Sequence, residues 1–230
     1  MKTYLTKLLL LASMLPPFAI SGFAINIGSL PYTIKKAGTY TLDRNLTFSG
    51  PGTKAITVTA SNVVLDLNGY TLTGTNGGNA VYAVYGSDAN SVTVQNGTIN
   101  GFILGIYFED SFQVLLQNLT VSNASTACIE LTTITTGTIQ NCFILGTSST
   151  GVYGIYLGAC QGIVVKNNQI ANEAIGGDSG DSFGNIFIAD QLTNCSYGLF
   201  LSAPDKYQGN VTIACANPFS GGIPVGFENN

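Results

Sequence analysis

Two aspartates recur at the same place in consecutive stretches of the sequence and are the best candidates for catalysis. Asp88 lies eight residues before Asn96, and Asp110 lies eight residues before Asn118. If the two stretches stack, the carboxylates come within about 5 Å, near the separation found in retaining glycosidases, and the pKa of one of them should rise. With Glu130 as a third member they would form a hydrolase site. A plain polar turn or a calcium site is the simpler explanation.

The chain contains no histidine, and this excludes several kinds of site at once. Ser-His-Asp and Cys-His catalysis, histidine general bases and histidine-ligated metals are all ruled out. The fragment Gly177–Gly180 (Gly-Asp-Ser-Gly) therefore completes no protease triad, although Asp178 and Asp181 are weak calcium candidates. Residues 176–184 are predicted to form a flexible insertion in an otherwise regular repeat.

A third set of positions is occupied mostly by aromatic residues. Tyr85, Tyr107, Glu130 and Tyr156 each lie eleven residues before an asparagine, and Phe200 takes the matching place farther along. Because apolar residues flank these positions, the side chains should point outward from their strands. A row of aromatic faces with hydroxyl groups suits stacking on sugar rings. The alternative is that residues 175–184, the C-terminal tail or another chain covers the row.

The elements that must position these residues recur at a nearly constant spacing. The segment Val92–Ile99 is echoed at Val114–Val121, Gly137–Ile144 and Ile163–Ile170, after 22, 23 and 26 residues. Each unit holds two or three short strands and no helix-length apolar pattern, so the units must stack on one another. The predicted interior column is Val94, Leu116, Ile139, Val165, Ile188 and Ile213. The asparagines at 96, 118, 141 and 167 should form a second interior column, interrupted by Asp190 and Cys215.

The segments Leu30–Leu42 and Ala60–Leu72, followed by these asparagine-centred coils, resemble exported right-handed parallel β-helix repeat proteins with a pectate-lyase-like fold. The resemblance implies an all-β fold, a single-stranded right-handed parallel β-helix (solenoid) of about seven to eight coils with roughly 22 to 28 residues each. One domain would span 25–230: a capping region and first coil (25–62), central coils (63–215) and a C-terminal tail (216–230). Lyases, hydrolases, epimerases and adhesins share this fold, so no activity is implied.

The sequence also departs from the enzymes of that fold. The Gly-His-Gly element of β-helix polygalacturonases is absent. A lyase needs an Arg or Lys base on the helix wall, but the only arginine, Arg44, lies in the capping region. Lys166 occupies the outward position held elsewhere by Gln95, Gln117 and Gln140, which indicates a solvent-facing role. Cleavage of acidic polysaccharides is therefore disfavoured unless calcium bridges the charges.

Composition and targeting signals define the setting. Residues 1–24 read as a signal peptide, which predicts a secreted, periplasmic or cell-surface protein with no membrane span. Eight Lys and Arg against twelve Asp and Glu leave no basic footprint for nucleic acid. The five cysteines are an odd number without a C-x-x-C pair, and we expect them to act as small buried apolar residues, with their pairing left open.

The interpretation that these observations favour is a non-catalytic binding or structural role at or outside the cell surface. The partner would be a glycan or a surface protein, contacted along the row Tyr85, Tyr107, Glu130, Tyr156 and Phe200. The alternative is a polysaccharide-acting enzyme, a glycoside hydrolase that uses Asp88, Asp110 and Glu130. No cofactor is needed in either case, although calcium could bind at Asp88, Asp110, Asp178 or Asp181. The oligomeric state is left open.

Overall fold

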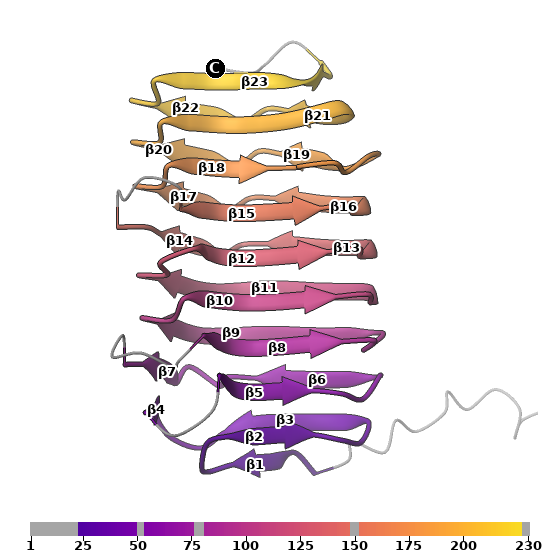
Figure 1. Cartoon of the computed structure of the whole chain (residues 1–230), viewed down its shortest axis with the longest axis vertical. Helices are drawn as coiled ribbons and strands as arrows, with labels where there is room; N and C mark the ends of the chain where they lie inside the picture. The colour runs from indigo at the N-terminus through magenta and orange to yellow at the C-terminus, as the bar shows by residue number, and fades with distance from the viewer. Residues whose placement is uncertain (1–22, 50–52, 76–80, 148–151, 227–230) are drawn as a thin grey trace, which may run out of the picture.

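The computed structural model describes residues 23–49, 53–75, 81–147 and 152–226 as an all-β solenoid. Its strands wind in about eight turns stacked along one axis, which confirms the predicted fold class (Figure 1). No helix occurs in the described residues, and so none there is long and apolar enough to cross a membrane. The predicted signal peptide, residues 1–24, lies almost wholly outside the described residues.

One long parallel sheet faces the viewer in Figure 1, and we name it the front sheet. It consists of β2 (Tyr32–Ile34), β5 (Lys54–Val58), β8 (Tyr82–Ser87), β10 (Leu104–Glu109), β12 (Ala127–Thr132), β15 (Tyr153–Gly158), β18 (Ile175–Asp178), the first part of β21 (Tyr197–Gln208) and β23 (Asn217–Pro224). Consecutive members pair in parallel and in register, so each residue lies over its counterpart in the next coil.

Two further sides close each coil. The second sheet contains β1 (Ile25–Ile27), β3 (Gly38–Leu42), β6 (Val63–Asp66), β13 (Thr135–Gln140), β16 (Gln161–Lys166) and β19 (Ile186–Ile188). The third contains β4 (Leu46–Phe48), β7 (Thr71–Gly74), β14 (Phe143–Leu145), β17 (Gln169–Ala171), β20 (Gln191–Thr193) and β22 (Val211–Ile213). The long strands β9 (Val92–Asn100) and β11 (Phe112–Ser122) run from the second side into the third.

The core is a set of apolar columns that run along the solenoid axis. Val84, Ile106, Ile129 and Ile155 are aligned on consecutive coils of the front sheet, and none has any exposed surface. Complete burial of such a side chain contributes about 1.5–3 kcal/mol relative to its exposure. Because a single coil cannot cover its own inner face, this stabilisation exists only between neighbours.

The predicted interior column is correct over its first four members and wrong beyond them. Val165 pairs with Phe187, which is fully buried, so Phe187 and not Ile188 continues the column. The coil from Val164 to its partner Ile186 is shorter than the spacing assumed. Ile213 lies in β22 of the third side and is 46% exposed. The predicted column therefore departs from the structure at the coil where the number of residues per turn changes.

The asparagine column lies at an outer corner, so the prediction that it is interior is wrong. Asn118, Asn141 and Asn167 are exposed, with φ between 53° and 55°. The corner needs a left-handed backbone, which asparagine adopts more readily than other non-glycine residues. Asn118 donates a hydrogen bond from Nδ2 to Oδ1 of Asn96, at 3.2 Å. In the next coil Ala189 (φ 54°), not Asp190, takes this corner.

Residues 176–184 are not a flexible insertion, and this prediction is also wrong. Gly176, Gly177 and Asp178 are buried in strand β18, which pairs with β15 and β21 like any other coil of the front sheet. A Cβ on Gly176 would lie 2.8 Å from the carbonyl oxygen of Gly198. The glycines here allow close packing between coils.

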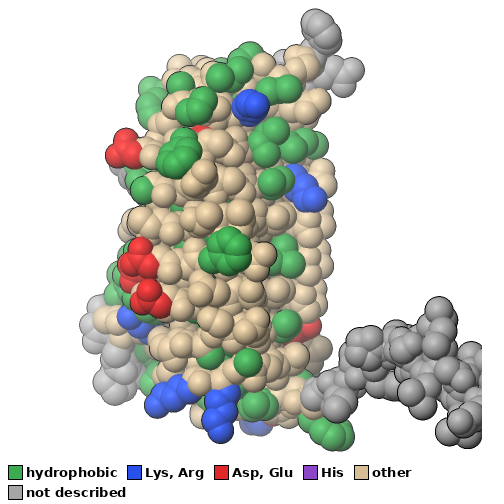
Figure 2. All heavy atoms as spheres, turned by 90° about the vertical axis from the view of Figure 1, so that its right-hand side faces the viewer, with side chains coloured by type: hydrophobic (Ala, Val, Ile, Leu, Met, Phe, Trp, Pro, Cys, Tyr) green, Lys and Arg blue, Asp and Glu red, His purple; other side chains and the backbone are tan. Residues whose placement is uncertain are grey.

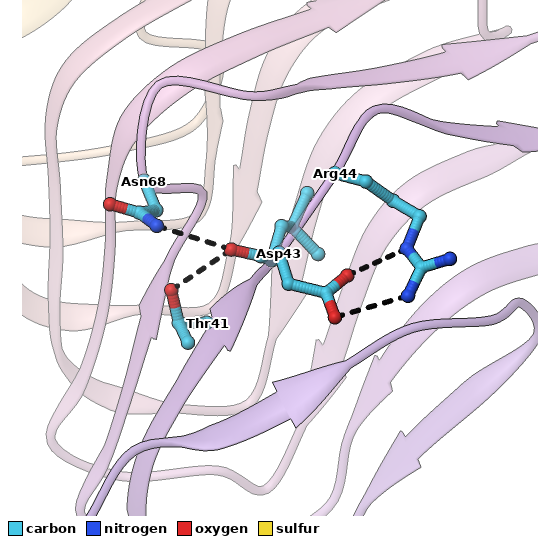
Figure 3. Close-up of polar contacts among 5 residues, drawn as sticks. Thr41, Asp43, Arg44 and Asn68 are labelled. Carbon is cyan, nitrogen blue, oxygen red and sulfur yellow. Dashed lines mark hydrogen bonds and ion pairs between the residues drawn. The ribbon is translucent and has the colours of Figure 1, made fainter.

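The first coil carries the chain's only arginine. Arg44 and Asp43 form an ion pair in which Nε and Oδ1 are 2.8 Å apart, and Thr41 and Asn68 donate to the carbonyl of Leu42 at 3.2 and 3.3 Å (Figure 3). The ion pair is solvent-exposed, which suits a surface role and not that of a buried base.

Polar groups replace apolar ones inside the C-terminal coils. Asn168, Asp190 and Asn210 stack in one interior column, in which Oδ1 of Asp190 accepts from the Asn168 backbone (2.8 Å) and side chain (2.9 Å). Glu173, which is 2% exposed, accepts from the Cys128 thiol at another corner. Burial raises the pKa of Asp190 and of Glu173 to about 7 each. Their second oxygens, Asp190 Oδ2 and Glu173 Oε2, have no hydrogen-bond partner.

These two acids should make the protein less stable as pH rises. In the unfolded chain they lose their protons near pH 4, whereas the folded protein keeps them until about pH 7, so the free energy of unfolding falls between those values. The loss is on the order of 3 kcal/mol for each group. We expect Asp190→Asn and Glu173→Gln each to flatten the pH dependence of denaturant unfolding. A wild-type profile that rises from pH 5 to pH 8 would contradict this expectation.

Candidate functional site

The predicted aromatic row forms one continuous column on the outer face of the front sheet. Tyr85 pairs with Tyr107, Tyr107 with Glu130, and Glu130 with Tyr156. Asp178, which we did not predict here, follows Tyr156 and is followed by Phe200. We name this column of six residues the tyrosine stripe: Tyr85, Tyr107, Glu130, Tyr156, Asp178 and Phe200. The three tyrosines are half-buried and Phe200 is 45% exposed.

A second column, which holds tyrosine in three of its six coils, runs beside the stripe and was missed in the sequence. Tyr82, Tyr153 and Tyr197 lie three residues before stripe members, and their rings contact those of Tyr85, Tyr156 and Phe200 at centroid distances of 5.2, 5.1 and 5.6 Å. The signal was available, because Tyr-x-x-Tyr or Tyr-x-x-Phe occurs in three coils. Strict alternation along a strand places residues i and i+3 on opposite faces, which is why the pattern was overlooked.

Two consecutive inward residues bring both columns to the same face. Between Tyr153 and Tyr156, for example, both Gly154 and Ile155 are buried. The first of the two inward positions carries a small residue, and a Cβ on Gly154 would lie 2.6 Å from the carbonyl oxygen of Gly176 in the next coil. Equivalent positions hold Ala83, Gly105, Cys128, Gly176 and Gly198. Close packing between coils at this column therefore widens the aromatic face.

At the N-terminal end of the stripe, one carboxylate accepts hydrogen bonds from two tyrosines. Glu109 accepts hydrogen bonds from the hydroxyls of Tyr85 and Tyr107, the latter at 2.9 Å. The two rings stack with centroids 5.7 Å apart and planes 16° apart, and Lys54 Nζ lies 3.1 Å from the Tyr85 centroid. The bond to Glu109 and burial raise the pKa of Tyr85, and burial and the same carboxylate raise that of Tyr107. The cluster is thus held rigidly with its hydroxyls protonated.

The middle of the stripe places acids on either side of a tyrosine. Glu130 precedes Tyr156 in the stripe, and Asp178 follows it. Burial raises the pKa of both carboxyl groups, while the backbone N–H of Gly180, 2.7 Å from Asp178 Oδ1, partly offsets the rise at Asp178. Burial and these two acids raise the pKa of Tyr156. This part of the stripe combines an aromatic face with hydrogen-bonding groups.

Asp88 and Asp110 lie at exposed corners of consecutive coils, where the front sheet turns into the second sheet. Their φ angles are 53° and 48°, so both occupy the left-handed region that aspartate tolerates. Asp110 accepts from the Thr133 hydroxyl at 2.5 Å, and Asp88 from the Ser87 hydroxyl at 3.4 Å. The left-handed backbone at these corners is sufficient to explain why aspartate occurs there, without a catalytic role. Figure 2 views this side of the molecule, where acidic side chains gather along one edge and basic ones mostly near the N-terminal end.

Calcium binding remains a prediction. Asp178 is buried in the stripe and Asp181 is exposed in the turn that follows. Within the four described ranges of the chain, no group of three or more His, Cys, Asp or Glu side chains is arranged to hold a metal ion.

Two segments that might have covered the stripe belong instead to the same wall. Residues 175–178 form strand β18 of the front sheet. The described part of the C-terminal tail forms β23, which extends that sheet by another coil. These parts of the two segments do not lie across the aromatic face, but the turn after β18 reaches it, since a Cβ on Gly180 would lie 3.1 Å from the Tyr156 hydroxyl oxygen.

A family model described as a right-handed beta helix region matches residues 34–214. This match covers most of the described solenoid and agrees with the right-handed winding that the family resemblance implies. No curated protein matches the chain.

Several solved structures are similar in fold. The Dettilon tailspike protein gp208 has 15% identity and a TM-score of 0.61, over 82% of this chain and 42% of that one. The enzymatically active domain of bacteriophage CBA120 tailspike protein 2 has 14% identity and a TM-score of 0.58, over 84% and 39%. The gp42 tailspike of Acinetobacter phage vb_AbaP_AS12 has 12% identity and a TM-score of 0.55, over 80% and 39%. The chain spans about two-fifths of these structures, and at such identities the likeness shows the fold alone.

The hydrogen bonds from two tyrosines of the stripe to Glu109 can be tested by titration. Glu109→Gln removes a negative charge beside Tyr85 and Tyr107, so both phenols should lose their protons at lower pH than in the wild type. An ultraviolet pH titration of the tyrosines measures the shift. Asp66→Asn, which neutralises a carboxylate of the second sheet that accepts from Gln95, Asn96 and the backbone of Asn68, is the matched control and should leave the titration unchanged. Identical titration curves for Glu109→Gln and the wild type would refute the hydrogen bonds from Tyr85 and Tyr107 to Glu109.

Proposed function

We propose that this chain, which belongs to the right-handed β-helix family, binds a glycan along the front sheet without cleaving it. The observation that carries the proposal is the paired aromatic face: three clusters of rings on one wall, built from Tyr82, Tyr85 and Tyr107, from Tyr153 and Tyr156, and from Tyr197 and Phe200. Contiguous partly exposed aromatic surface of this kind marks a contact site.

The chemistry of the face favours a sugar polymer over a purely apolar partner. Sugar rings have an apolar face that stacks on aromatic side chains and hydroxyls that need polar partners. The hydroxyls of Tyr85 and Tyr107 donate to Glu109 but can still accept hydrogen bonds, and the half-buried Glu130 carboxyl group supplies a further polar partner in the same wall. Because the coils repeat about every 4.8 Å, the clusters suit an extended ligand that runs along the solenoid axis.

The charge of the wall favours a neutral glycan. The tyrosine stripe contains two carboxylates and no Lys or Arg, and the nearby Lys54 lies over the ring of Tyr85. An acidic polysaccharide would meet like charges there without compensation. We therefore expect neutral polymers to bind more tightly than uronate-containing ones.

Removal of single rings tests the proposal. Tyr107→Ala and Tyr156→Ala should each weaken binding of a neutral glycan at least about tenfold, because central aromatic contacts carry much of the energy of an interface. Affinity electrophoresis against a panel of neutral and acidic polysaccharides finds the ligand, and calorimetry with oligosaccharides measures the loss. Phe112→Ala removes a 42% exposed aromatic ring outside the stripe and is the matched control. Equal affinity in all three variants would overturn the proposal.

The second candidate function is hydrolysis of a polysaccharide. It is favoured by the raised pKa of the half-buried Glu130 carboxyl group, which is the property that a general acid requires. One of the similar structures, that of CBA120 tailspike protein 2, is an enzymatically active domain. In this case Asp88 and Asp110 would lie one coil apart, about 5 Å between backbones, with Glu130 three residues before Thr133 at the next corner.

Size-exclusion chromatography separates the two functions. We expect the polymer to co-elute with the protein and to keep its length, with and without calcium. Shortening of any polymer would refute the non-catalytic proposal. Asp110→Asn and Glu130→Gln would then identify the carboxylate, since loss of turnover with retained binding marks a catalytic residue.

A further inference from the structure

Two cysteines occupy neighbouring positions in the last two coils. Cys195 follows β20 and Cys215 follows β22, and these two strands pair in parallel. Backbone hydrogen bonds continue the pairing past the strands, from Asn194 N to Ile213 O at 2.9 Å and from Ala216 N to Cys195 O at 3.1 Å. The Cα atoms of the two cysteines are therefore about 5 Å apart, the spacing of hydrogen-bonded strands.

Their thiols reach toward the same place. Cys215 Sγ lies 3.6 Å from the carbonyl oxygen of Leu192, in the coil below its own. Cys195 Sγ lies 3.5 Å from the carbonyl oxygen of Thr193, two residues earlier in the chain. The two thiols also interact directly as hydrogen-bond partners. The sulfur atoms thus face each other across the boundary between the last two coils.

We propose that Cys195 and Cys215 form a disulfide that fastens the last coil to the one before it. A disulfide requires Cα atoms about 4.4–6.8 Å apart, and stacked residues of neighbouring coils satisfy this requirement. None of the other three cysteines is stacked on a second cysteine: in the following coil Cys128 lies beside Gly154, Cys142 beside Asn168 and Cys160 beside Ser182. The pairing is therefore specific to one pair among the five.

The oxidant is a disulfide, either a small molecule such as oxidised glutathione or the active-site disulfide of a thiol oxidoreductase. Cys215 is the more accessible thiol, so its thiolate attacks first, forms a mixed disulfide and releases one thiolate of the oxidant. Cys195 then loses its proton and attacks the Cys215 sulfur, which releases the second thiol. In sum, two protein thiols and one disulfide give one protein disulfide and two thiols. Burial, which raises the pKa of the Cys195 thiol to about 12, makes the second step the slower one.

The bond would act where the solenoid is least protected. Thr212, the inward residue of β22, is only partly buried, whereas its counterparts Ile144, Ile170 and Leu192 in the preceding coils are at most 1% exposed. A covalent link between residues 195 and 215 removes unfolded conformations in which this coil is detached. We expect oxidation to raise the melting temperature by roughly 5 °C or more and to protect the C-terminal coil from proteolysis.

Mass spectrometry of the purified full chain before and after incubation with oxidised glutathione tests the proposal. The wild type should fall from five to three titratable thiols and lose the mass of two hydrogens, and a digest without reduction should contain a peptide linked through Cys195 and Cys215. This measurement needs no variant and does not depend on ligand binding. Retention of all five thiols, or a link between any other pair, would overturn the proposal.

Serine variants provide the controls. Cys195→Ser should stop at a glutathione adduct on Cys215 and show no gain in melting temperature on oxidation. Cys142→Ser replaces a buried cysteine whose thiol bonds to a main-chain carbonyl, and it should still lose two thiols and gain stability as the wild type does. If Cys195→Ser still loses two thiols on oxidation, another pair of cysteines forms the bond and the proposal is refuted.

Discussion

Every feature of this protein depends on one constraint, the in-register parallel stacking of coils. Backbone hydrogen bonds fix neighbouring coils about 4.8 Å apart and place each residue directly over its equivalent. A residue type that suits one level of the column is then repeated at the next, as with the Gln117 amide that donates to Gln95 and accepts from Gln140 at 2.9 and 2.8 Å. The apolar columns, the amide ladders and the tyrosine stripe all result from this in-register stacking and differ only in their side chains.

The stacking also explains why polar residues are tolerated inside. Asp190 is buried, yet Asn168 in the coil below donates to its carboxyl Oδ1, and Asn210 in the coil above accepts from its backbone N–H. A buried carboxyl group without such partners would cost several kcal/mol. The interior thus changes from apolar to polar along the axis without a change in the backbone.

The central coils could be predicted from sequence because their spacing is regular and their residue types repeat. Val94, Leu116 and Tyr107 were placed correctly from a period of two within strands and about 23 between coils. The same reasoning failed at Ile188, where the coil is shorter, and at Asn118, where the left-handed corner and not hydrogen bonding inside the core selects asparagine. A repeat reveals which residues are equivalent but not which face of the coil they occupy.

The composition of the candidate site was less predictable than its position. Tyr82 was missed because two inward residues in succession break the alternation, and Asp178 because its glycine-rich strand resembles a loop. The hydrogen bonds from Tyr85 and Tyr107 to Glu109 depend on side-chain directions in two neighbouring strands, which no local pattern contains. Such contacts become visible only when the coils are assembled.

The small residues beneath the aromatic columns have a consequence for how the sequence can change. Because Gly154 and Gly176 let neighbouring coils meet closely, the face above them is set by the backbone and does not depend on any one ring. Deletion or duplication of one complete coil would preserve every column and alter only the length of the wall. Loss of a single residue within a coil would instead rotate all later side chains out of register. The gene for such a wall can therefore lengthen or shorten by whole coils far more easily than by single codons.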